Sequence, residues 1–368
     1  MEQALPAALP LPALPALLLP LPALPLSSDK YRFLSSGPQS QLEPLVLTEA
    51  LREHIHTEIM NVWGLKRLLL SHLPCSSPTS LMREDIPRVL DGDYYVGLKT
   101  DGVRMFLFLC CHNDTNYAVF IDRAFNMYSA KVDTRDPQHS RYFLGGGTMF
   151  DGELITARAG TGTEFVVFDV MRVCGRDTTH HLFSERLARI QTAFAQVTTQ
   201  PGLTVTVKTW TRVRDIKADP DSFVHMYTSH QDNGTCDGLI FVNEYGSLYA
   251  GTQGDMFKWK KAAHHTVDFL WDAEHKALVL CSRSQQQYPY VLADTINVFM
   301  VPHWRENNIR HGEIIECSLK RDENAVTGWH ATPVCIRDDK KRPNNINIAL
   351  LTIRNVVENV ELEDIFSA

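Results

Sequence analysis

Hydrophobic positions along the chain alternate between helical and strand-like spacing. From 47 to 70 they follow helical spacing, which predicts one or two helices there. The residues that define this spacing are Leu51, Ile55, Ile59, Val62 and Leu69. A later helix is expected from Ser184, a candidate N-cap, because a stripe of buried positions follows it. That stripe consists of Leu187, Ile190, Phe194 and Val197.

Short runs of β-branched and aromatic residues predict two sets of strands. The first set covers residues 94–98, 104–111, 117–121, 149–155, 165–170, 203–210 and 239–243. The second set covers residues 267–271, 277–281, 296–301, 314–319 and 329–336. Five short strands close together are typical of a small β-barrel such as an OB-fold. Dense apolar positions over 346–360 then predict a packed helix.

Composition places the chain among soluble globular proteins, with 368 residues, 44% of them hydrophobic and 21% charged. The net charge of −7 excludes a surface that is basic all over, but not a local basic cleft for phosphates. Eight scattered cysteines without a C-x-x-C pair disfavour a zinc site or a disulfide framework and indicate a reducing compartment.

The first 26 residues are almost all Ala, Leu and Pro. This stretch is hydrophobic enough for a signal peptide but lacks a basic start, since the first lysine is Lys30. Its repeated prolines would break a transmembrane helix. We therefore expect a low-complexity, polyproline-like tail, and no membrane span elsewhere.

The most informative segment reads Lys99-Thr100-Asp101-Gly102-Val103-Arg104 and joins two predicted strands. A lysine at a strand end can project into a cleft, and Asp-Gly supplies a tight turn. Companion motifs follow in a fixed order. They are Phe150-Asp151-Gly152-Glu153-Leu154, Phe165 to Asp169, Asp237 to Phe241, Lys258-Trp259-Lys260, and Arg337-Asp338-Asp339-Lys340 with Asn344 or Asn345.

This series resembles the covalent nucleotidyltransferase superfamily of mRNA capping enzymes and polynucleotide ligases, over about residues 99–344. A lysine attacks phosphorus only as the neutral amine, and nearby cations disfavour its protonated form. Carboxylates such as Glu153 and Asp237 can hold a divalent metal, Mg²⁺ or Mn²⁺. The metal and basic side chains then offset charge on the phosphates.

The resemblance implies a role for each matched position. Lys99 would be the nucleophile that forms lysyl-N-GMP, and Phe168 would stack on the purine. The other expected catalytic residues are Lys258, Lys260, Arg337, Asp339 and Lys340. The other expected substrate-binding residues are Thr100, Arg104, Glu153, Lys208 and Asp268, and the expected metal ligands are Asp237 and Glu153.

The architecture we expect is α+β. A Leu/Pro-rich tail covers 1–28, and an ATP-grasp-like nucleotidyltransferase domain of antiparallel sheets and helices covers 29–262. An OB-fold β-barrel domain follows over 263–345, with a C-terminal helix and acidic end over 346–368. In the family, the barrel domain closes over the triphosphate and reopens to admit RNA.

The pattern Arg337-x-Asp339-Lys340 is similar to capping enzymes and favours GTP and a 5′-diphosphate RNA as substrates. An ATP-dependent RNA or DNA ligase is the alternative enzyme, and a non-catalytic RNA- or polymerase-binding module is the alternative from another class. An RNA triphosphatase and a cap methyltransferase are expected on separate chains. The phosphorylated tail of RNA polymerase II is a further partner that the resemblance allows. The expected location is the nucleus, or a cytoplasmic replication site for a viral protein.

Overall fold

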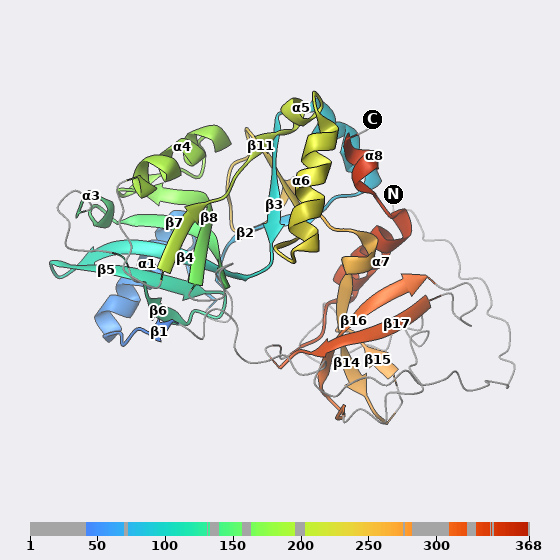
Figure 1. Cartoon of the computed structure of the whole chain (residues 1–368). Coiled ribbons are helices and arrows are strands. Elements are labelled where there is room, and N and C mark those ends of the chain that lie inside the picture. The colour runs from blue at the N-terminus through green and yellow to red at the C-terminus, as the bar shows by residue number, and fades with distance from the viewer. Residues whose placement is uncertain are drawn as a thin grey trace, which may run out of the picture.

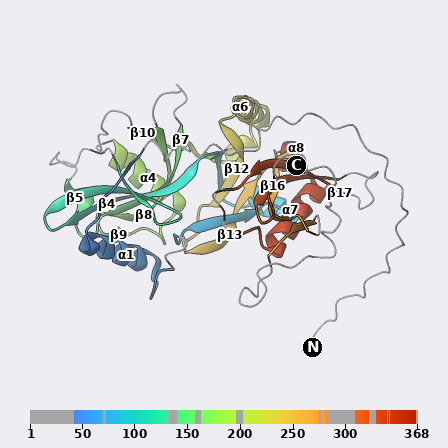
Figure 2. The ribbon, with the colours of Figure 1, turned by 90° about the horizontal axis from the view of Figure 1, so that it is seen from below.

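The computed structural model describes residues 42–69, 73–130, 132, 140–156, 163–195, 203–274, 277–281, 309–321, 329–338, 340 and 342–366. Within them the chain forms three β-sheets with helices packed on their faces (Figure 1). The first two sheets adjoin one another, and the third belongs to the C-terminal part of the chain (Figure 2).

The first sheet has eight strands. Its order is β1 (Glu43–Pro44), β6 (Met127–Ser129), β5 (Thr115–Asp122), β4 (Val103–His112), β7 (Thr148–Thr156), β8 (Thr163–Val173) and β10 (Leu203–Val207), with β9 (Arg176–Asp177) on β8. The β8–β10 pair is parallel and the other pairs are antiparallel. Residues 105–110 of β4 are buried, because helices cover both faces of the sheet.

Helix α1 (Glu49–Trp63) covers one face of this sheet, and α4 (Phe183–Phe194) covers the other (Figure 1). The hydroxyl of Thr48 accepts a hydrogen bond from the Leu51 amide at 3.2 Å and caps α1. Gly64 ends the helix at φ 60°, which favours glycine. The short α3 (Ser140–Phe143) lies on the α4 side, because its aromatic residues share that core.

The second sheet has five strands. Their order is β11 (Thr211–Arg212), β3 (Tyr94–Thr100), β12 (Cys236–Asn243), β13 (Gly251–Trp259) and β2 (Ser76–Ser80). Four helices bury side chains in one core with this sheet. They are α2 (Ile86–Asp91), α5 (Val213–Ile216), α6 (Pro220–Asp232) and α8 (Leu362–Phe366).

The third sheet is antiparallel, with the order β15 (Ala277–Val279), β14 (Thr266–Asp272), β16 (Ile314–Arg321) and β17 (Trp329–Ile336). The short helix η4 (Ala262–His264) leads into it, and α7 (Ile346–Glu358) packs on it through Ala349. The chain then returns to the second sheet, where the Trp259 indole donates to the carbonyl of Val360 at 2.7 Å. Arg83 of η3 (Arg83–Asp85) also contacts Glu358 and Asp364.

Most of the predicted strands and all three predicted helix regions are present, with several differences. Helix α1 ends at Trp63, so Leu69, which was expected to share its apolar spacing, lies beyond the helix and is exposed. Ser184 does not cap α4: the N-cap is Leu182, and the Ser184 hydroxyl instead donates to Glu244. The strand expected over 203–210 ends at Val207. Helix α7 is less buried than expected, with Ile348, Leu350, Leu351 and Val357 exposed.

The mixed architecture of antiparallel sheets and helices agrees with the expected fold class. The OB-fold stays a prediction, because the described strands form a four-stranded sheet and the strand expected over 296–301 lies outside the described residues. The tail over 1–28 also lies outside them. In the described part of the chain, every helix is too short or too polar to cross a membrane.

Candidate active site

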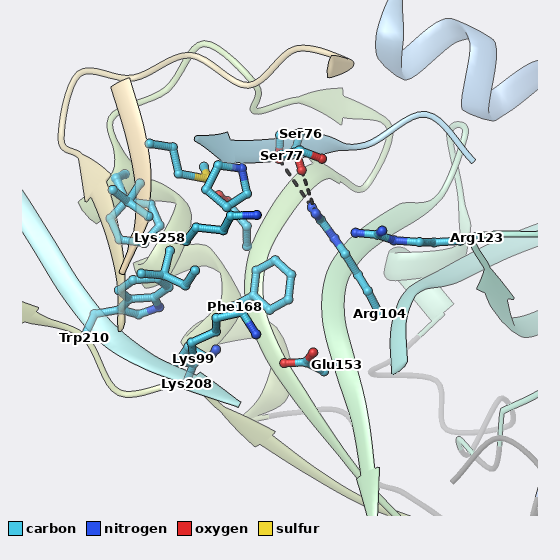
Figure 3. A pocket seen from close by; sticks show the side chains of 16 residues that line it. Ser76, Ser77, Lys99, Arg104, Arg123, Glu153, Phe168, Lys208, Trp210 and Lys258 are labelled. Atoms are coloured by element: carbon cyan, nitrogen blue, oxygen red, sulfur yellow. Dashed lines mark hydrogen bonds between the residues drawn. The ribbon is translucent and has the colours of Figure 1, made fainter. Parts of the chain in front are cut away.

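A pocket of about 320 Å³ lies between the first and second sheets (Figure 3). The first sheet contributes charged and aromatic residues from β4, β7 and β8, and the second contributes residues from β2, β3, β12 and β13. Its lining includes Lys99, Arg104, Glu153, Phe168, Lys208 and Lys258. The structure thus brings together six of the residues expected from the sequence.

Lys99 stands near the end of β3 and faces Asp237 of β12. Its Nζ donates to Oδ1 of Asp237 at 2.7 Å, and Lys260 pairs with the other carboxylate oxygen. The β3–β12 pairing has an irregularity between Cys236 and Gly238, so Asp237 has no partner in the register. Such a bulge re-aims a side chain, which explains how Asp237 reaches two lysines.

The carboxylate of Asp237 is held in its charged form. Burial raises its pKa, but the ammonium groups of Lys99 and Lys260 outweigh burial and leave the pKa below its ordinary value. The next residue, Gly238, has no space for a side chain, because an added Cβ would lie 2.0 Å from the carbonyl oxygen of Trp259. In this Asp-Gly pair, the aspartate is therefore explained by its charge beside two lysines, and the glycine by the lack of space for a side chain.

Phe168 is also presented by a bulge. Asp151 pairs with Asp169 and Gly152 pairs with Val167, which leaves Phe168 without a partner in the β7–β8 register. The ring lines the pocket, with the guanidinium carbon of Arg104 5.3 Å from its centre. An exposed aromatic face beside cations is a stacking surface for a flat base.

Arg104 is fixed by a buried carboxylate. Its Nε donates to Asp151 Oδ1 at 2.9 Å, a second bond joins Nη2 to the other oxygen, and Nη1 donates to the carbonyl of Ser76 at 2.6 Å. Asp151 is only 1% exposed. Burial lowers the pKa of Arg104, but the Asp151 carboxylate outweighs it and raises the pKa above its ordinary value. Asp151 therefore positions Arg104.

Lys208, Thr100 and Glu153 form a hydrogen-bonded chain along one wall of the pocket. Lys208 Nζ donates to the hydroxyl of Thr100 at 3.3 Å, and that hydroxyl donates to Glu153. Burial lowers the pKa of Lys208 to about 8. Burial also lowers the pKa of Lys258, with help from the charges of Lys260 and Lys99.

The C-terminal residues form a separate cluster in the third sheet. Asp268 of β14 is 4% exposed and pairs with Arg337, at 3.2 Å, and with Lys340. Arg337 also lies 3.2 Å from Glu316. These residues do not line the pocket between the first two sheets. Asp339 lies outside the described residues.

Several pocket residues had no role in the sequence-based prediction, among them Ser76, Arg123 and Trp210. Ser76 lies in the stretch Ser-Ser-Pro-Thr-Ser, which has no apolar pattern to indicate a strand. Arg123 directly follows β5, and Trp210 stands two residues after Lys208, so its proximity to an expected substrate-binding residue is the signal that could have found Trp210.

A strand-end lysine beside a carboxylate, in a pocket rich in cations and with an aromatic stacking face, defines a covalent nucleotidyltransferase type of site. The chain also matches a known protein family. The family model of the mRNA capping enzyme catalytic domain matches residues 45–262. This chain belongs to the mRNA capping enzyme family.

Individual relatives agree with the assignment to this family. The mRNA-capping enzyme subunit alpha of Saccharomyces cerevisiae is 24% identical, covering 79% of this chain and 77% of that protein. The subunit alpha of Schizosaccharomyces pombe is also 24% identical, covering 79% and 78%. Among solved structures, mycobacterial DNA ligase D complexed with ATP and MES covers 74% of this chain at 13% identity. Its TM-score of 0.41 is too low to assign the fold.

Proposed function

We propose that this protein is an mRNA guanylyltransferase that transfers GMP from GTP, through Lys99, to the 5′-diphosphate end of RNA. The observation that carries the proposal is the placement of Lys99 Nζ 2.7 Å from Asp237, beside a pocket with Lys258, Arg104 and Phe168. Membership of the capping enzyme family supports the choice of GTP and RNA.

In the first step, the neutral Nζ of Lys99 attacks the α-phosphorus of GTP. A P–N bond forms, and the bond from the α-phosphorus to the bridging oxygen breaks, so that pyrophosphate leaves with the electron pair. Oδ1 of Asp237, which accepts the hydrogen bond of Lys99, orients the amine, and the proton lost by Lys99 passes to solvent. Lys258 lines the pocket and offsets charge on the α-phosphate.

The nucleoside occupies the rest of the pocket. Phe168 stacks on the purine, and Lys208 donates to the guanine carbonyl. Glu153 and Thr100, which already share a hydrogen bond, face the ribose. Arg104 contacts the sugar or phosphate from the position that Asp151 fixes. Each contact uses a group that lines the pocket or a neighbour that holds it.

In the second step, an oxygen of the RNA β-phosphate attacks the phosphorus of lysyl-GMP. A new P–O bond forms, the P–N bond breaks, and the amine of Lys99 takes a proton as it leaves. The product has guanosine joined to RNA through three phosphates. A 5′-diphosphate end requires an RNA triphosphatase upstream, and cap methylation would follow on another chain.

Arg337 and Lys340 have a role only if the third sheet moves toward the pocket. We expect closure over the triphosphate to bring these cations to the departing pyrophosphate, and opening to admit RNA. Before closure, the carboxylate of Asp268 forms ion pairs with both Arg337 and Lys340. Positioning of this kind can lower the activation free energy by several kcal/mol.

The pocket suits a hard divalent cation shared with the substrate. In the described residues, no three His, Cys, Asp or Glu side chains converge on one metal position. Mg²⁺ is usually held by one or two carboxylates together with substrate phosphates and water, and Mn²⁺ accepts the same oxygen donors. Asp237 and Glu153 fit that donor set. A bound ion would neutralise charge on the phosphates.

Covalent labelling tests the proposal. The purified chain is incubated with α-labelled GTP or ATP and a divalent metal, then separated on a denaturing gel. We expect label from GTP only, labile in acid and absent from Lys99→Ala. Lys320→Ala, an exposed lysine of β16, serves as the matched control and should keep its label. Label from ATP alone would make the protein a ligase, and no label from either would favour a binding module.

A further inference from the structure

Trp210 lies between β10 and β11 and lines the same pocket. Its ring is held from two sides. It makes an edge-on contact with Phe183, with 5.0 Å between ring centres. An added Cβ on Gly97 would lie 2.8 Å from the indole, so the ring lies directly on the backbone of β3. A ring held in this way cannot turn its N–H freely to solvent.

The indole N–H of Trp210 is a buried donor without an acceptor in the described part of the chain. An unsatisfied buried donor costs about 1–3 kcal/mol, so natural proteins rarely keep one without a reason. By comparison, the Trp259 indole has its acceptor at 2.7 Å. Because Trp210 lines a substrate pocket, a bound molecule is the available source of the missing acceptor.

The ammonium of Lys208 shows which part of the substrate faces Trp210. Its Nζ lies 5.3 Å from the ring centre of Phe168 and 5.9 Å from that of Trp210. Figure 3 shows Trp210 and Lys208 on one side of the pocket, with Arg104 and Arg123 on the other. The ammonium of Lys208 and the indole ring of Trp210 therefore lie on the same side of the pocket, near the ring of Phe168.

Two neighbouring donors match a base edge that presents two neighbouring acceptors. Guanine has such an edge, with O6 and N7, whereas adenine has N7 beside a donating amino group. We propose that Trp210 Nε1 donates a hydrogen bond to the O6–N7 edge of guanine and, with Lys208, selects GTP over ATP. This inference rests on the proposed function, because it takes GTP as the substrate.

The test replaces Trp210→Phe, which keeps an aromatic ring for Phe183 and removes the N–H. Trp63→Phe is the matched control, because the Trp63 indole N–H is also buried without an acceptor but lies outside the pocket lining. The rate constant for label formation is measured at low nucleotide concentration. The nucleotides are GTP, 7-deaza-GTP, which lacks N7, and 2-aminopurine riboside triphosphate, which lacks O6.

We expect Trp210→Phe to lower the rate constant with GTP about tenfold, the value of one hydrogen bond, and Trp63→Phe to leave it within about twofold. With the analogue that lacks the accepting atom, Trp210→Phe should cost nothing further. An equal loss with all three nucleotides would show a merely structural role and overturn the inference, as would no loss with GTP. Absence of label in the wild-type chain would instead refute the proposed function itself.

Discussion

The depressed pKa of Lys208 makes GTP binding depend on pH. Burial lowers this pKa to about 8, so the side chain is about 90% charged at pH 7 and about 10% charged at pH 9. The charged form is the one that donates strongly to a guanine carbonyl. When only a fraction of molecules can bind, the apparent dissociation constant rises by the inverse of that fraction. The affinity for GTP should therefore fall about tenfold between pH 7 and pH 9.

The assay is equilibrium binding of GTP in the Lys99→Arg background, where no covalent step follows and a positive charge is kept near Lys208. Dissociation constants are measured by calorimetry between pH 6.5 and 9.5. The companion variant is Lys208→Arg, whose guanidinium stays charged throughout. Titration of GTP itself affects both dissociation constants equally. The ratio of the two constants at each pH therefore measures the effect of the Lys208 charge on binding.

The sign of the effect is fixed by the direction of the shift. Raising the pH removes the proton from Lys208. The affinity for GTP is therefore constant well below pH 8 and falls as the pH rises through 8. ATP carries an amino group in place of the carbonyl and should show no such decline. A ratio of dissociation constants that stays level across the pH range, or a loss of GTP affinity that begins only near pH 10, would contradict this role of Lys208.

Three other perturbations follow from the contacts described above. Asp151→Asn leaves the buried Arg104 without its carboxylate, which should cost about 3–5 kcal/mol and lower the melting temperature by roughly 6–20 °C; an unchanged calorimetric transition would contradict this. Asp268→Asn should lower kcat for label formation about 10- to 100-fold with little change in KM, because Arg337 and Lys340 lose their common anchor; a rise in KM alone would contradict this. Removing divalent cations with a chelator should abolish labelling, and Mg²⁺ or Mn²⁺ should restore it; full labelling in the chelator would exclude a metal requirement.

The sequence predicts those parts of the fold where local pattern and tertiary structure agree. The strands that carry Lys99, Arg104 and Glu153 are long apolar runs, so they were recognisable from the sequence alone. Strand β2 was not recognisable, because Ser76–Ser80 has no apolar residue and pairs only through a distant partner, β13. Helix α6 was also missed, since a largely polar helix buries only Phe223 and Tyr227.

The geometry of the site depends on features that no motif encodes. The bulges at Asp237 and Phe168 arise from the registers of separate strand pairs, and these registers re-aim the two side chains. The pairing of Arg337 and Lys340 with Asp268, away from the pocket, likewise follows from the third sheet.

In the proposed reaction, Lys99 carries GMP to the 5′-diphosphate end of an RNA. The most direct measurement isolates the labelled protein free of GTP and adds RNA with either a 5′-diphosphate or a 5′-monophosphate end. We expect label to leave the protein only for the diphosphate RNA. Nuclease digestion should then release it as guanosine joined to the first nucleotide through three phosphates. Transfer to the monophosphate RNA instead, or label that stays on the protein with both, would contradict the proposed reaction.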